Sequence, residues 1–578
     1  MADPAPGLQS GPWGFPVSRL RQFAGVGASG PTSGGGWNAS WTWAALVIAA
    51  LAGLPIAAIL WASLAGTNSG PSGTIADLAA TVLPTYIANT ALLMTLAGIF
   101  AAVTGTGCAW LIAATRFPGR KLLGWALVLP LAVPAYIAAY IYADLLDYAG
   151  PVQAGLRGLT GWGPQDYGFP DIRSLGGGAF VLGIVLYPYV YLLARTAFAT
   201  QSFSQFRAAR SLGAAPAAAF WRVALPAARP AIAGGLALVL MEVLADFGVA
   251  EYFAIPTFST GIFRSWLAAG DKQAALKLAA VMLLFVIALV ALEAATRRGR
   301  TDSRDGLAAR GNGEPLVALS TLGKGLALIA CLIPVLLGFV LPAGYLAALA
   351  LSDVAQGAAG DLATYARGSL WLGLTAASVC LVVGLLLAFA RARSPSPLTA
   401  GAIRLATLGY ALPGALLAVG LLAPLGAFDQ SLTRFARDTL GWSGGLLLTG
   451  TSAILIYALS VRFLTVAYNT VSGGLARIPP SLDAAARSLG ARPARVLARI
   501  YVPLLAPSLA GAAALVFIDT LRELPATLIL RPFNLETLAT RTYRLASDER
   551  LVEAAIPALI LLAAGLLPVL VLNRLSRR

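Results

Sequence analysis

The sequence predicts an all-α integral membrane protein with about twelve transmembrane helices in two parallel six-helix repeats. Hydrophobic residues make up 58% of the 578 residues and charged residues only 11%, with a mean hydropathy of +0.77. Soluble domains carry about a quarter charged residues, so this composition indicates a membrane protein. Apolar runs of about 20 residues, long enough to cross the hydrocarbon, recur along the chain. A polar, basic segment also occurs twice, at positions 277 residues apart.

The order of the predicted segments follows from these runs and from the polar stretches between them. Residues 1–40 are rich in Gly, Pro and Ser and are expected to form a disordered cytoplasmic tail, not a cleaved signal peptide. A charged linker at 297–322 separates a first repeat, 41–296, from a second repeat, 323–578. Because six is an even number, each half begins and ends on the same side of the membrane. Both halves therefore have the same orientation, as in parallel repeats. The predicted spans are 43–64, 88–114, 123–146, 178–199, 230–252, 275–296, 323–350, 368–390, 402–425, 446–468, 507–529 and 552–573.

The distribution of basic residues sets the expected orientation. Most of the 41 Lys and Arg residues fall in loops that are cytoplasmic if the N-terminus is inside. Both termini and both copies of the repeated segment are then cytoplasmic. The net charge of +16 does not indicate a nucleic-acid partner, because the basic residues occupy short loops between apolar spans.

The repeated segment forms two predicted cytoplasmic loops, 203–229 and 477–506. Eleven positions match at one offset, including a glycine and three prolines in each copy. The small-residue run favours a helix, the glycine a sharp break, and Pro216 or Pro493 the first turn of a second helix. The alternative is that both segments are ordinary amphipathic loops, but that alternative does not explain why eleven positions match between them. The residues concerned are Ala208, Ala209, Arg210, Ser211, Leu212 and Gly213, and again Ala485, Ala486, Arg487, Ser488, Leu489 and Gly490.

This pattern resembles the "EAA" loop of binding-protein-dependent ABC importer permeases. The resemblance implies a type I importer permease (MetI-like) fold, in which these two loops couple to two copies of a cytoplasmic ABC ATPase. It also implies that ATP and Mg²⁺ bind to the ATPase and not to this chain. The family's acidic residue is replaced by Arg207 in one copy and by Ala484 in the other, where Asp483 lies just before it.

Two further segments are similar to the ferric-iron permeases of this superfamily. They are Leu244 to Val249, followed by Thr260, and Glu523 to Pro532, followed by Thr537 to Thr540. The fused, two-repeat form is also typical of those permeases. The resemblance implies a periplasmic iron-binding protein as a partner, a bacterial inner-membrane location, and import of ferric iron.

The sequence carries no signature of chemistry of its own. It has no phosphate-binding Gly-x-x-x-x-Gly-Lys-Ser/Thr motif and no histidine, so we expect no enzyme activity and no bound cofactor. Cys108, Cys331 and Cys380 lie within apolar runs, too far apart in sequence to suggest a disulfide framework. Any metal would meet oxygen ligands, and whether the chain holds one stays open.

Acidic residues inside membrane spans are costly and therefore informative. Glu242 and Asp246 lie in the fifth predicted span, and Asp519 and Glu523 in the matching eleventh. Alignment of the loops places Asp246 and Asp519 at similar depths. Such acids can line a cation path, or they can pair with Arg522 or Arg531 for structure alone, and both readings stay open. The tyrosines that can add oxygens to a path are Tyr136, Tyr140, Tyr187 and Tyr189.

Alternative functions remain at this stage. The same machine can serve thiamine, a phosphonate or a polyamine. A gradient-driven secondary transporter also often has twelve spans, but it has no need of two ATPase-docking loops. A structural or receptor protein explains neither the duplication nor the intramembrane acids. The outer loops are expected to dock a binding protein. Arg531, Arg541 and Arg544 can meet acidic residues of that partner, but we expect them to be solvated.

Overall fold

The computed structural model describes most of the chain, and the account below is confined to those residues. They are 35–65, 75–163, 165–200, 202–298, 317–356, 362–441, 445–446, 448–479, 481–482, 486, 488, 490 and 493–576. Over these residues the protein is helical, with one isolated β-bridge between Thr115 and Val317. Most of the predicted tail and linker lies outside the described residues. Helix α2 begins at Gly35, so the predicted tail was too long at its C-terminal end.

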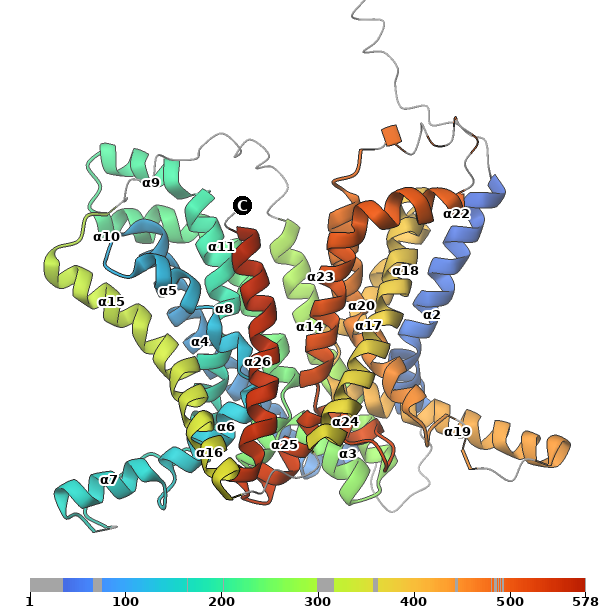
Figure 1. The fold of residues 1–578 in the computed structure, drawn as a ribbon, viewed down its shortest axis with the longest axis horizontal. Helices are drawn as coiled ribbons and strands as arrows, with labels where there is room; N and C mark the ends of the chain where they lie inside the picture. The colour runs from blue at the N-terminus through green and yellow to red at the C-terminus, as the bar shows by residue number, and fades with distance from the viewer. Residues whose placement is uncertain are drawn as a thin grey trace, which may run out of the picture.

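The helices form two groups of similar order, with the long helices of both groups running roughly parallel (Figure 1). The first repeat contains α2 (Gly35–Ala65), α3 (Ile75–Ala80), α4 (Leu83–Ala114), α5 (Arg120–Ala126), η1 (Leu129–Ala132), α6 (Ala135–Leu146), α7 (Pro151–Thr160), α8 (Leu175–Thr200), α9 (Ser202–Ser211), α10 (Pro216–Ala219), η2 (Phe220–Ala224), α11 (Leu225–Ala245), α12 (Gly248–Tyr252), α13 (Phe258–Phe263), η3 (Arg264–Ala268) and α14 (Lys272–Arg298).

The second repeat follows a similar order, but its helix α19, with 27 residues, is longer than the corresponding α6, with 12. It contains α15 (Thr321–Val335), η5 (Leu336–Val340), α16 (Leu341–Gln356), α17 (Leu362–Arg393), α18 (Pro397–Ala406), η6 (Thr407–Ala411), α19 (Gly414–Leu440), α20 (Ser452–Leu475), α22 (Pro493–Val496), η7 (Leu497–Tyr501), α23 (Val502–Arg522), α24 (Pro525–Leu530), α25 (Leu538–Ser547) and α26 (Leu551–Ser576).

Local details recur between the repeats at nearly constant offsets. The π-helical turns η2 and η7 precede α11 and α23 at positions 277 residues apart. Thr257 and Thr260 form a capping box at the start of α13, and Thr537 and Thr540 form the same box at α25. A capping box satisfies backbone N–H groups that the first helical turn leaves unpaired. The two halves are therefore built alike down to individual hydrogen bonds.

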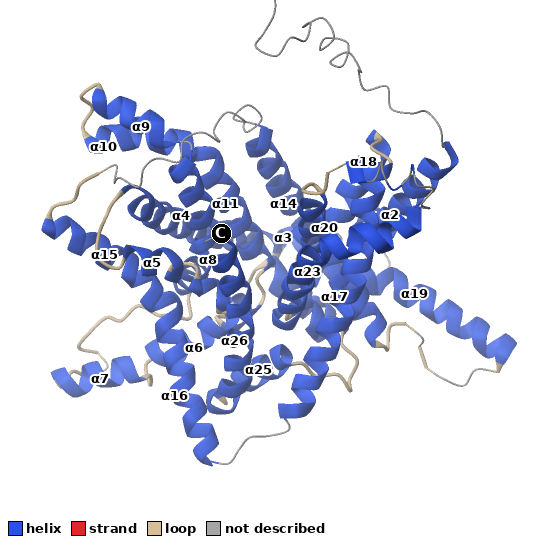
Figure 2. Cartoon of the chain, turned by 45° about the horizontal axis from the view of Figure 1, so that its top comes forward, coloured by secondary structure: helices blue, strands red, loops and turns tan. Residues whose placement is uncertain are grey.

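The first helix of each repeat packs against the other repeat. Helix α2 contacts α17, α18 and α19, while α15 contacts α4 and α5, and α16 contacts α6. Figure 2 shows α2 beside α18 and α15 beside α5. This exchange joins the halves into one continuous core, which includes residues from both repeats.

The exchange also brings two cysteines of different repeats near each other. Cys108 on α4 and Cys331 on α15 are distant in sequence and both are buried, and the Cys108 thiol donates to the carbonyl of Ala330, next to Cys331, at 3.7 Å. Both are free thiols, as is the buried Cys380. The contact exists because α15 crosses onto the first repeat, which sequence spacing alone does not reveal.

The predicted spans are recovered in part. Among the described residues, ten helices are long and apolar enough to cross a membrane, and a bent pair adds an eleventh if it counts as one span. The apolar stretch of α26, Leu551–Leu567, is shorter. The predicted continuous span 123–146 is wrong, because the chain bends by 92° between Arg120–Ala132 and Ala135–Thr160. Proline at 134 lacks an N–H and restricts the preceding residue, which favours this break.

Three further predicted spans have breaks in the structure. The predicted span 402–425 crosses from α18 through η6 into α19, with Leu412 in an extended conformation. The predicted spans 230–252 and 507–529 end as helices at Ala245 and Arg522 and resume as the short helices α12 and α24. These last two breaks position the acidic residues described next.

Candidate functional site

An acidic residue occupies each of the two breaks. Asp246, extended at ψ 135°, accepts hydrogen bonds at one carboxylate oxygen from the backbone N–H groups of Val249 and Ala250, both at 3.1 Å. Glu523, at ψ 123°, accepts from Ala526 and Thr527 N–H, both at 3.0 Å. Each carboxylate therefore caps the first turn of the short helix that follows, where backbone donors favour negative charge.

The structure corrects the predicted pairing of the acids. Helices α11 and α23 match at an offset of 277 residues, which makes Asp519 the counterpart of Glu242 and Glu523 the counterpart of Asp246. The expectation that Asp246 and Asp519 lie at similar depths is wrong by one helical turn. Both repeats instead place one acid in the last turn of the long helix and one at the break.

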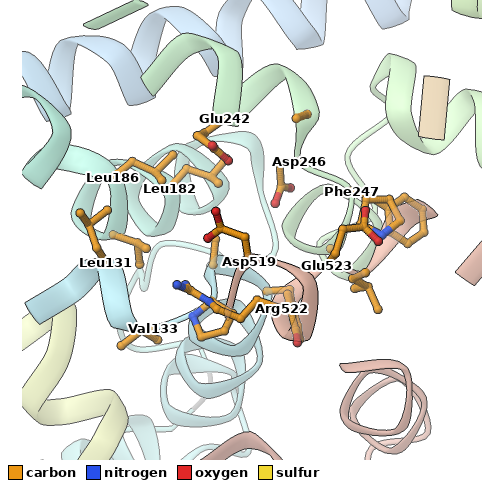
Figure 3. Close-up of a pocket in the computed structure, with 18 of the residues that line it drawn as sticks. Leu131, Val133, Leu182, Leu186, Glu242, Asp246, Phe247, Asp519, Arg522 and Glu523 are labelled. Carbon is orange, nitrogen blue, oxygen red and sulfur yellow. The ribbon is translucent and has the colours of Figure 1, made fainter. Parts of the chain in front are cut away.

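All four acids line one cavity of about 200 Å³ between the repeats. Figure 3 shows Glu242 and Asp519 turned toward each other, with Asp246 beside them. The first repeat also contributes apolar residues of η1, α6 and α8, and the second repeat contributes Tyr410, Arg462 and Arg522. Four carboxylates therefore face two guanidinium groups. The predicted path residues Glu242, Asp246, Asp519 and Glu523 are brought together.

One of the acids is paired. Arg462 Nη1 lies 3.6 Å from Glu523 Oε1, with side-chain exposures of 15% and 2%. A β-carbon at Gly414 would lie 2.5 Å from Glu523 Oε1 and 2.7 Å from Arg462 Nη1, so any larger residue would force the pair or the backbone to move. The structural role expected for such acids holds for Glu523, but its partner is Arg462. Arg531 is instead paired with Glu536, at 3.5 Å.

Two of the four predicted tyrosines reach the cavity. Tyr136 and Tyr189 line it, whereas Tyr140 and Tyr187 are fully buried elsewhere, and their hydroxyls have no hydrogen-bond partner among the described residues. Sequence reasoning missed Tyr410, which donates a 3.5 Å hydrogen bond to Glu242 Oε1. Its only sequence signal is its place just before Pro413, in a predicted span.

Among the residues that the structure describes, the cavity does not contain a cluster of the side chains that usually bind metal ions in proteins. Within the described part of the chain, no group of three or more His, Cys, Asp or Glu side chains could hold a metal ion. The cavity offers carboxylate and phenol oxygens from both repeats. Such a set suits a hard cation in transit.

The first repeated loop has the predicted helix–glycine–helix form. Helix α9 ends at Ser211, Gly213 has a left-handed φ of +88°, and Pro216 occupies the first turn of α10. Arg210 donates to the carbonyl of Ala214 at 2.6 Å, which closes the turn. Leu212 is 87% exposed at the tip. The loop is thus a compact knob with an apolar side chain in the open.

The second loop is described only in part. Gly490 again has a positive φ, +76°, and Ala486 is buried while Ser488 is exposed. The predicted coupling residues Asp483, Ala485, Arg487 and Leu489 lie outside the described residues. Figure 1 places α9, α10 and α22 at the end of the molecule where the C-terminus lies, opposite α7 and α25. Both knobs therefore share one face.

The arginines expected to be solvated at the opposite face are held within the chain. Arg544 pairs with Glu536 at a distance of 2.5 Å, and Glu536 also binds Arg531. The guanidinium of Arg541 lies over the ring of Tyr365, 5.1 Å from its centroid. This network orders the segment between α24 and α25.

Known proteins resemble this chain, one of them over most of its length. It is 26% identical over 539 residues to the Fe(3+)-transport system permease protein FbpB 2 of Haemophilus influenzae, which covers 92% of this chain and 98% of that protein. A probable molybdenum ABC transporter permease of Haloferax volcanii is 29% identical over 41% of this chain and 82% of its own length. A putative 2-aminoethylphosphonate permease, PhnV of Salmonella typhimurium, is 33% identical over 23% of this chain and 51% of its own length.

A family model supports the same assignment. The model described as "Binding-protein-dependent transport system inner membrane component" matches residues 94–298 and, separately, residues 380–578. The two matches cover most of the chain, one in each repeat. The chain therefore belongs to the inner-membrane permeases of binding-protein-dependent ABC transport systems, with two permease units fused in one polypeptide.

Proposed function

We propose that this chain is the membrane-spanning subunit of an ATP-driven importer that carries ferric iron delivered by a periplasmic binding protein. Iron passes between the repeats by alternating access. The observation that carries the proposal is the cavity between the repeats, where four carboxylates face two guanidinium groups. An excess of negative charge in a low-dielectric space attracts a cation and repels an oxyanion.

The choice of iron among the substrates of related proteins rests on this charge and on the extent of the similarity. Molybdate and phosphonates are anions that would meet the same carboxylates. The similarity to the Fe(3+) permease spans 92% of the chain, whereas that to the phosphonate permease spans 23%. Both facts favour iron over the oxyanions.

Energy comes from partner subunits in this proposal. Each knob, one at Gly213 and one at Gly490, docks one subunit of an ATPase dimer on the cytoplasmic side, where both termini also lie. ATP and Mg²⁺ bind there, and this chain hydrolyses no ATP itself. The shared face of the two knobs supports one dimeric partner. The face with α7 and α25 is then periplasmic and receives the binding protein.

Reconstitution tests the proposal. The full chain, its ATPase and its binding protein are placed in proteoliposomes, and ATP-dependent uptake of radioactive iron(III) is compared with uptake of molybdate, 2-aminoethylphosphonate, a polyamine and thiamine. We expect uptake of iron alone, and none without ATP. Uptake of another substrate in place of iron contradicts the proposal. Uptake driven by an ion gradient without the ATPase also contradicts it.

A further inference from the structure

Four oxygen-bearing side chains, two from each repeat, line the cavity. Tyr189 on α8 and Glu242 on α11 come from the first repeat, and Tyr410 on η6 and Asp519 on α23 come from the second. Tyr410 donates a hydrogen bond to Glu242 across the repeat interface at 3.5 Å. Both tyrosines and both acids line the same cavity. Each repeat thus contributes one phenol and one carboxylate.

A second feature of the cavity indicates that its polar groups are not satisfied by the protein alone. Tyr136 lines the same cavity, is only 6% exposed, and its hydroxyl has no hydrogen-bond partner among the described residues. Buried hydroxyls are almost always hydrogen-bonded, so this residue of the cavity wall has a polar group for which the described protein supplies no partner.

We infer that Tyr189, Glu242, Tyr410 and Asp519 form a transient iron(III) site at the repeat interface, an inference that rests on the proposed function. Iron(III) is a hard cation that favours anionic oxygen ligands, and phenolate is among the strongest of these. Each phenol releases its proton to water as its Fe–O bond forms. Two phenolates and two carboxylates leave one net negative charge around Fe³⁺, and Arg522, which also lines the cavity, offsets it.

The division of the ligands between the repeats provides a route for release. When the repeats separate, the set splits into two halves, each with one phenol and one carboxylate. Neither half retains four ligands, so the ion is held less tightly as the cavity opens. The other two acids differ because Asp246 and Glu523 each use carboxylate oxygens to cap a short helix.

The test uses the colour of phenolate bound to iron(III), a charge-transfer band in the visible range that carboxylate ligation does not produce. The full chain in lipid nanodiscs is titrated with iron(III) nitrilotriacetate, alone and assembled with its ATPase, with and without ATP. We expect the band in wild type, weaker bands in Tyr189→Phe and Tyr410→Phe, and loss of the band in the double variant. Glu242→Gln and Asp519→Asn should keep the band but require more iron for half-saturation.

The matched control is Tyr142→Phe. Tyr142 is also a tyrosine in the membrane region, but its hydroxyl donates to the carbonyl of Leu337 and it does not line the cavity. Its band should equal that of wild type. A band that survives in the double variant overturns the inference, and so does iron uptake by proteoliposomes with no band in any state. Those two results leave the proposed function standing, whereas absence of both uptake and band overturns both.

Discussion

The two breaks beside the cavity occupy the same position in the two repeats but treat their negative charge differently. Asp246 and Glu523 each cap a short helix through two backbone N–H groups. Glu523 also accepts from the Thr527 hydroxyl and is paired with Arg462. No ion pair to Asp246 is present in the part of the chain that the structure describes. In the second repeat the charge of Glu523 is therefore balanced by Arg462. In the first repeat the charge of Asp246 is not balanced by an ion pair among the described residues.

The difference arises from residues that do not repeat. Helices α6 and α19 both begin after a proline, but the first residue of α6 is Ala135 and that of α19 is Gly414. The missing β-carbon at Gly414 makes room for the carboxylate and guanidinium together. The two breaks are thus equivalent in the backbone, and Gly414 accommodates an ion pair at Glu523 that Asp246 lacks among the described residues.

The largest expected effect comes from Glu523→Gln. Removal of the charge leaves Arg462 mostly buried and unpaired, which costs about 3 kcal/mol of unfolding free energy. Thermal unfolding in detergent, followed by tryptophan fluorescence, measures the loss. Adding Arg462→Gln to this variant should recover part of the stability, because the uncompensated charge is then gone. If the double variant is less stable than Glu523→Gln, the pair does not have this role.

Gly414→Ala tests the same pair without a change of charge. The new β-carbon would lie 2.5 Å from Glu523 Oε1, so the pair must separate or the helix must shift, at a cost of about 2 kcal/mol. Gly426→Ala is the control, since it lies in the same helix and its β-carbon would meet nothing within 4 Å. That variant should keep or slightly raise the melting temperature. Equal destabilisation by both substitutions would refute the steric argument.

Asp246→Asn tests the unpaired side of the comparison. Asparagine keeps one oxygen to cap α12 and leaves no cation unpaired, so we expect a stability loss of only about 1 kcal/mol. Iron uptake by the reconstituted importer should nevertheless fall, because the cavity loses a negative charge. Uptake is compared with that of Asp166→Asn, at an acid that lies outside the cavity and contacts the backbone of Gly163. If iron uptake by Asp246→Asn is unchanged, Asp246 does not contribute to the iron path.

The sequence allowed the repeats, the loops and the four acids to be predicted, but not the backbone around them. Hydropathy records apolar content, and the apolar runs continue past Asp246 and Glu523, so the helix ends there were not foreseen. The 277-residue offset of the loops, carried on to the acids, would have paired Glu242 with Asp519. The roles of Tyr410 and Arg462 depend on how η6 and α20 pack against the rest of the cavity, which no local pattern encodes.

Substitution of the two knob glycines should affect stability least. It should, however, strongly affect the coupling of ATP hydrolysis to transport. Gly213 and Gly490 adopt φ of +88° and +76°, and a β-carbon at either would meet open space. Alanine there costs about 1 kcal/mol of local strain, which an exposed turn relieves by changing shape without unfolding the protein.

The double variant Gly213→Ala/Gly490→Ala should therefore melt like wild type but consume more ATP per iron imported. Because altered knobs no longer fit the ATPase, ATP is hydrolysed without a matching amount of iron transport. Gly401→Ala, in the helical α18 and also facing open space, is the control and should leave the ratio unchanged. The single variants Gly213→Ala and Gly490→Ala test whether the knobs of the two repeats contribute equally to coupling. If either alone uncouples as fully as the double, the two knobs act together on one ATPase dimer. An unchanged ratio in the double variant shows that the knobs do not transmit the nucleotide cycle.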